Sequence, residues 1–71
     1  MKYENVYFNN YDICLECVKE LKKICHKVNY WFFKENENAP HVVVYMAIGK
    51  QEKNEALNIV TKFVTKEIME G

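Results

Sequence analysis

The chain has 71 residues, of which 49% are hydrophobic, and its ten basic and ten acidic side chains leave no net charge. A domain of this size buries only about 60% of the surface that its unfolded chain exposes, so its core alone is marginal. The neutral balance argues against nucleic-acid binding, which normally needs a basic stripe to neutralise phosphates. With two glycines and one proline, we expect a single domain over residues 1–71, mostly in regular elements.

The first part of the chain predicts a strand followed by a helix. Residues 3–8 are rich in strand-forming side chains. Asn9, Asn10 and Asp12 are N-cap candidates for a helix that extends to about Lys27. At about 100° per residue, one stripe of this helix is apolar and the opposite side is charged. The stripe contains Tyr11, Ile13, Cys14, Cys17, Val18, Leu21, Ile24 and Cys25.

Residues 28–35 and 41–48 predict two hairpin strands joined by a turn at 36–40. A half-buried strand alternates apolar with polar residues, but here Tyr30 and Phe32 point to one face while Trp31 and Phe33 point to the other. Both faces of the hairpin are therefore apolar. Two helices cannot cover both faces, so we expect a second copy of the chain or a partner protein to cover one of them.

The last segment predicts a helix from about Gln51 to Met69, preceded by Gly49, which ends the second hairpin strand. Its expected core stripe, flanked by Ala56 and Phe63, consists of Leu57, Val60, Val64 and Ile68. Ile59 lies outside that stripe. Together with Phe63 it predicts an apolar extension on the helix flank that a partner could contact.

The predicted element order is β-α-β-β-α, an α+β fold of two layers. If the first β-α-β unit follows the right-handed crossover rule, both helices pack on one face of a three-stranded sheet. This arrangement is a truncated ferredoxin-like fold. It leaves the other face of the sheet open.

Cys14 and Cys17 form a Cys-x-x-Cys at the start of the first predicted helix, where backbone N–H groups and the helix dipole lower a thiol's pKa. With the element order, this motif resembles the heavy-metal-associated domains of copper chaperones and metal-pumping ATPases. The resemblance implies that Cys14 and Cys17 bind copper. The chain has Asp12 and Tyr11 where that family has Met and Gly, so we do not assign it to the family.

The position of the three cysteines on one apolar stripe suggests a simpler interpretation. Free cysteine behaves as a small hydrophobic residue, and the stripe accounts for Cys14, Cys17 and Cys25 together. We therefore expect packing and no cofactor. Soft-metal binding or thiol redox chemistry at Cys14 and Cys17 is the alternative.

Other functional classes have weaker support. The sequence shows no nucleophile, acid and base set and no glycine-rich phosphate loop, so we do not expect an enzyme. The aromatic residues 30–33 could stack single-stranded nucleic-acid bases, which is a second alternative. No apolar run approaches the ~20 residues that span a bilayer, and the N-terminus has no signal-peptide core. An odd number of cysteines predicts reduced thiols and a cytoplasmic protein.

The sequence thus predicts a small protein-interaction module that binds itself as a homodimer, a protein partner, or both. Two alternative strand faces could form the contact, with Ile59 and Phe63 added from the last helix. One consists of Trp31, Phe33, Val43 and Tyr45, and the other of Tyr30, Phe32, Val44 and Met46. By association, the small size and the composition rich in Lys, Asn and Tyr suggest a phage or mobile-element inhibitor of a host defence protein.

Overall fold

The computed structural model describes residues 3–31 and 40–70, which form three strands and two helices. In chain order these are β1 (Glu4–Phe8), α1 (Tyr11–Ile24), β2 (Lys27–Trp31), β3 (His41–Met46) and α2 (Lys50–Glu70). The predicted α+β fold is confirmed. Within the described residues, no helix is both long enough and apolar enough to cross a membrane.

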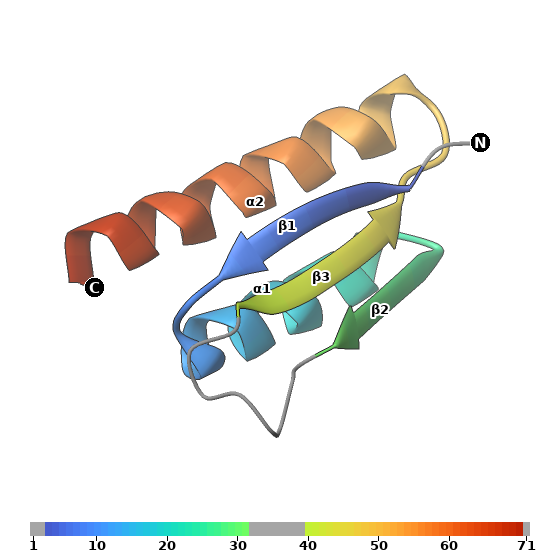
Figure 1. Cartoon of the computed structure of the whole chain (residues 1–71). Helices are drawn as coiled ribbons and strands as arrows, with labels where there is room; N and C mark the ends of the chain where they lie inside the picture. Colours follow the sequence, from blue (N-terminus) through green and yellow to red (C-terminus); the bar gives the residue numbers. More distant parts are fainter. Residues whose placement is uncertain (1–2, 32–39, 71) are drawn as a thin grey trace.

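The sheet has the order β1-β3-β2, and β3 pairs antiparallel with both neighbours. β1 and β2 are therefore parallel to each other and separated by β3, as in a split β-α-β unit. Both helices lie on one side of the sheet, and α2 runs alongside β1 (Figure 1). α1 packs against all three strands, whereas α2 packs against α1 and β1.

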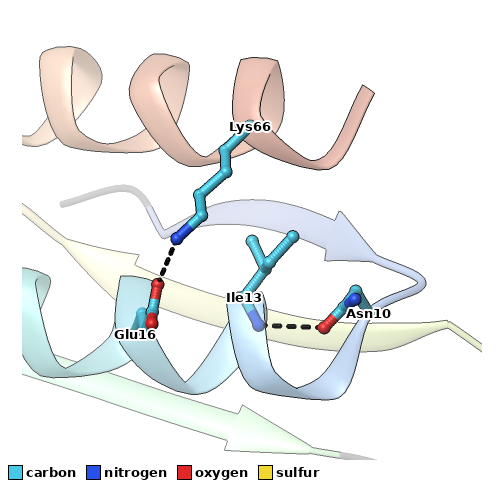
Figure 2. Close-up of polar contacts among 4 residues, drawn as sticks. All are labelled: Asn10, Ile13, Glu16 and Lys66. Atoms are coloured by element: carbon cyan, nitrogen blue, oxygen red, sulfur yellow. Dashed lines mark hydrogen bonds and ion pairs between the residues drawn. The ribbon is translucent and has the colours of Figure 1, made fainter. Parts of the chain in front are cut away.

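α1 begins where the sequence predicts and ends earlier. The Asn10 side chain accepts a hydrogen bond of 3.1 Å from the backbone N–H of Ile13, which caps the helix (Figure 2). At the other end, Cys25 is extended (φ −93°, ψ 140°) and its N–H donates to the carbonyl of Leu21. The prediction of a helix to Lys27 was wrong, because Lys27 pairs with Met46 in the sheet.

The hairpin strands also differ from their predicted bounds. β2 begins one residue earlier than predicted, and β3 ends at Met46 rather than Ile48. Gly49, which has a positive φ of 83°, precedes α2 and makes the change of direction that a side chain would hinder. Phe32, Phe33 and residues 36–39 of the predicted turn at 36–40 lie outside the described residues.

One hydrophobic core fills the space between the sheet and the helices. Its fully buried centre comes from every element except β2, which contributes the partly buried Val28 and Tyr30. From α1 it takes Ile13, Cys14, Cys17, Val18 and Leu21, as the apolar stripe predicts. The two remaining surfaces, the far face of the sheet and the outer side of α2, carry exposed apolar residues and are candidates for binding.

Candidate functional site

The register of the sheet decides which residues share a face. Trp31 pairs with Val42, and Val42 pairs with Tyr7, so these three side chains form one row across the strands. The next row is Asn5, Val44 and Asn29. Because side chains alternate along a strand, both rows lie on the face away from the helices. We call this face the open face.

The predicted binding faces combined residues from opposite sides of the sheet, and this was wrong. Trp31 was grouped with Val43 and Tyr45, but both of these are buried in the core on the helix side. The other set had the same fault, since Tyr30 lies beside Val43 while Val44 and Met46 belong to the open face. A shift of one residue in the pairing of two strands moves every side chain of a strand to the opposite face of the sheet. When both faces are apolar, the sequence pattern does not determine which register forms.

The open face has exposed aromatic residues at its margins. Tyr7 on β1 is 59% exposed and Trp31 on β2 is 56% exposed, whereas Val42 between them is half-buried. Val44 and Met46, which follow on the central strand β3, are buried. The paired strands place one charged side chain on this face, that of Lys27. Over the paired residues of the three described strands, the open face is therefore aromatic and amide-rich, with little charge.

The structure orients α2 differently from the prediction. The predicted stripe contained Leu57 and Ile68, but these residues are 58% and 76% exposed. Ala56 and Phe63 are the buried residues of the helix, and Ile59, Val60 and Val64 are partly buried against the core. The expectation that Phe63 and Ile59 form an exposed binding flank was also wrong, because Phe63 is only 5% exposed and Ile59 is partly buried against the core.

Polar contacts between α2 and the rest of the chain explain this orientation. The Glu67 carboxylate accepts hydrogen bonds of 2.6 Å from the backbone N–H groups of Asn9 and Asn10, between β1 and α1. Glu52, near the other end of α2, accepts from the N–H of His26 at 3.2 Å. Lys66 forms an ion pair of 3.0 Å with Glu16 of α1 (Figure 2). The contacts of Glu67 and Glu52 hold α2 with the side that carries Leu57 and Ile68 turned outward, and the exposed pair of Lys66 with Glu16 is compatible with this orientation.

The cysteines lie in the core, as the packing interpretation predicts. Cys14 and Cys17 have no exposed surface, and all three thiols are free. Burial raises the pKa of Cys14 to about 11, with a further contribution from Glu67. Burial, followed by Cys14, raises the pKa of Cys17 to about 12. The expected lowering by the helix start was wrong, since desolvation of a thiolate outweighs the dipole here.

Among the described residues, no group of three or more His, Cys, Asp or Glu side chains is placed to hold a metal ion. Two protonated thiols inside a core are also poor ligands, because metals bind thiolates. Copper binding by Cys14 and Cys17 would therefore require the start of α1 to open. The copper alternative stays a prediction that this packing disfavours.

A ring cluster occupies the helix side of the sheet at the start of α1. The Tyr11 ring lies 6.4 Å from that of Tyr30 and 5.3 Å from that of His41, measured between centroids. Burial, and then a hydrogen bond with Tyr11, raises the pKa of Tyr30 to about 12. Tyr30 is thus part of the packing between layers and not of an exposed base-stacking platform.

No protein family, curated protein or solved structure matches the chain.

Proposed function

We propose that this protein is a small non-enzymatic protein-interaction module whose open sheet face binds another protein chain. The exposed row of Tyr7, Val42 and Trp31 carries this proposal. Tyrosine and tryptophan offer a large apolar area together with a hydrogen-bonding group, and both are enriched in protein interfaces.

The amide side chains of the open face support a protein as its ligand. Asn5 and Asn29 are exposed on either side of Val44. They can hydrogen-bond with peptide groups around an apolar centre, which is the usual anatomy of a protein interface. Single-stranded nucleic acid fits less well, because Lys27 is the one basic residue that the paired strands place on this face.

The proposal places the protein in the cytoplasm, where free cysteines remain reduced. The suggested role as a phage or mobile-element inhibitor of a host defence protein concerns the identity of the partner. It stays a prediction from size and composition.

A photo-crosslinking amino acid at position 29, beside Trp31, tests the function. We expect irradiation of producing cells to give a discrete protein adduct. An adduct of twice the chain's mass would identify a second copy, and any other mass a different protein. Trp31→Ala should weaken the adduct strongly, because tryptophan is enriched among the interface residues whose truncation costs about 2 kcal/mol or more.

The matched control places the crosslinker at position 69. Met69 is 82% exposed on α2, away from the sheet, so its exposure is at least as great as that of the open face. We expect no discrete adduct there. A nuclease-sensitive adduct at position 29, or equal labelling at both positions, would contradict the proposal.

A further inference from the structure

The outer edge of β1 is a second candidate surface, distinct from the open face. β1 pairs with β3 on one side only, so its other edge has no strand partner among residues 3–31 and 40–70. Sheet edges are often protected by lysine, proline or a bulge, but β1 reads Glu-Asn-Val-Tyr-Phe and has neither lysine nor proline. Every second residue of β1 directs its backbone N–H and C=O groups to this edge, where another strand can pair with them.

α2 extends over this free edge. Among the described residues, α2 contacts β1 but not β3 (Figure 1). A helix with its side chains is about 10 Å wide, which is roughly twice the spacing of 4.8 Å between neighbouring strands. α2 therefore covers two strand positions, and β1 occupies one of them. The other position lies next to the free edge of β1.

The side of α2 above this second position is apolar. Lys66 points to α1, where it pairs with Glu16, so residues about 160–180° around the helix from Lys66 lie away from α1. These residues are Leu57, Val64 and Ile68, and the partly buried Val60 adjoins them. We call the position between the free edge of β1 and these four residues the edge slot.

A hollow adjoins each end of the edge slot. The first hollow, of about 310 Å³, lies at the beginning of β1, where Glu4 and Leu57 are among its lining residues. The second, of about 440 Å³, follows the end of β1, where Asn10 and Ile68 are among its lining residues. β1 is five residues long, so a strand beside it would extend for about 17 Å, from one hollow to the other.

The charges around the edge slot do not select an ionic ligand. Glu4 and Lys53 carry opposite charges and line the same hollow. At the other end, Glu67 already accepts hydrogen bonds from the backbone of Asn9 and Asn10. Recognition must therefore come from the backbone groups of β1 and the apolar side of α2. An extended segment with apolar side chains at alternate positions satisfies both, because the side chains of a strand alternate between its two faces.

A second folded copy of the chain does not fit the edge slot. Its β1 would bring its own α2 into the space that the first α2 covers. Its β2 would bring α1, which packs against β2, and its β3 already has a strand on each side. The segment that fits has no helix of its own on that side of the sheet.

We propose that the edge slot binds an extended segment of another protein, which joins the sheet beside β1 and places alternate apolar side chains beneath α2. The remaining side chains of the segment lie beside Asn5 and Tyr7 and enlarge the open face. This inference goes beyond the proposed function, because it concerns the edge of the sheet and gives the ligand a backbone conformation and a side-chain pattern.

Nuclear magnetic resonance titration with a synthetic peptide tests the edge slot. The probe is a peptide of about nine residues in which valine alternates with threonine, with a lysine at each end for solubility. We expect saturable shifts of the β1 amides and of the Leu57 and Val64 methyl groups, with a Kd below about 1 mM. Exchange of the outward-directed β1 amides should slow at least tenfold in the complex.

Two variants with the same substitution separate the edge slot from the rest of α2. Leu57→Lys should weaken peptide binding at least tenfold, because the charge must lose water beneath the bound strand. Asn58→Lys is the matched control, since Asn58 is exposed and points about 100° further around the helix. It should leave the Kd unchanged. Leu57 is mostly exposed, so both variants should keep the wild-type circular dichroism.

Two modified peptides test pairing through the backbone. One carries N-methyl groups on its valines and the other on its threonines, and each modification removes the hydrogen-bond donors of one edge of the strand. We expect one modified peptide to lose binding and the other to bind within a few-fold of the parent. Equal losses for both peptides would show that β1 is not the partner of an added strand.

The absence of saturable shifts in β1 up to 2 mM peptide would overturn the proposal. Shifts confined to Tyr7, Val42 and Trp31 would also overturn it, and would place the peptide on the open face. A homodimer that the peptide dissociates would assign the edge slot to a second copy instead of another protein. Failure of the proposed function is read separately, from the adduct at position 29.

Discussion

The two helices differ in how strongly their sequences determine which side is buried. α1 has one apolar stripe opposite a charged face, so only one orientation keeps its charges in water. α2 has apolar residues over much of its circumference, and the residues that the structure buries, Ala56 and Phe63, were predicted to flank the core stripe. An amphipathic pattern fixes the orientation of a helix only when the alternative would bury charge.

Phe63 and Leu57 give the strongest test of this difference. Phe63→Ala should lower the free energy of unfolding by about 3–5 kcal/mol, because it leaves a cavity in the core. Leu57→Ala should change it by less than about 0.5 kcal/mol in the monomer, since Leu57 is mostly exposed. Urea unfolding of both variants at low protein concentration measures these two free-energy changes. The opposite ranking would mean that α2 packs in the orientation predicted from its sequence.

Glu67 tests the polar contacts that hold α2 in place. Glu67→Gln should cost about 1–2 kcal/mol, because the carboxylate accepts two short hydrogen bonds from the backbone of Asn9 and Asn10. Glu70→Gln, in the same helical turn, is the matched control and should cost much less. Equal effects in urea unfolding would show that these hydrogen bonds do not stabilise the orientation.

Cys17 tests the buried stripe of α1. Cys17→Ala should cost about 1 kcal/mol near neutral pH, as for a small core truncation. The pKa of Cys17 rises from 9.0 to about 12 on folding, so above pH 9 the unfolded chain loses this proton first. The stability from this thiol is fully present below pH 9 and is lost as pH rises toward 12.

The same sign holds for Cys14, Cys25, Tyr30 and Tyr45, whose pKa values are also raised. Cys17→Ala should therefore reduce the fall in the urea midpoint between pH 8 and pH 10.5 without abolishing it. An unchanged fall, or rapid alkylation of Cys17 in the native protein, would contradict its burial and favour the metal-binding alternative.

The smallest expected effect comes from the ion pair of Lys66 with Glu16, which joins the two helices at an exposed position. Lys66→Met should change stability little at low salt and not at all at high salt, because exposed ion pairs are weak and screened. Lys23→Met, which removes the exposed pair of Lys23 with Glu20 within α1, is the control. A large loss for Lys66 alone would indicate that this pair sets the orientation of α2.

Local sequence signals located the strands, the helix starts and the buried face of α1. Asn10 is the N-cap because its side chain can accept from Ile13, and the charged residues of α1 exclude all but one orientation. The bounds were less certain: α1 ends at Ile24, and Lys27 pairs in the sheet. Whether a residue at such a boundary joins the helix or the next strand depends on its pairing partner, which is distant in sequence. For Lys27 that partner is Met46.

The open face is the part of the candidate site that sequence patterns could not define. Val43 and Val44 are equally apolar, but Val43 faces the helices and Val44 the open side. The register of β3 against its two neighbouring strands determines which of these two valines faces the helices. The contacts of Glu67 and Glu52 with backbone N–H groups were missed as well, because exposed glutamates on a helix carry no signal of the loop they reach.

The sequence by itself determined an α+β fold and a buried cysteine stripe, and it predicted more apolar surface than two helices can cover. These features depend on composition and on periodicity within single elements. The tertiary structure decided that Trp31 shares a face with Val42 and that α2 turns Leu57 and Ile68 outward. Which face of a strand or helix is buried depends on its pairing with segments distant in the sequence. When both faces of an element are apolar, the free-energy difference between burying one face and burying the other comes from the elements that pack against it.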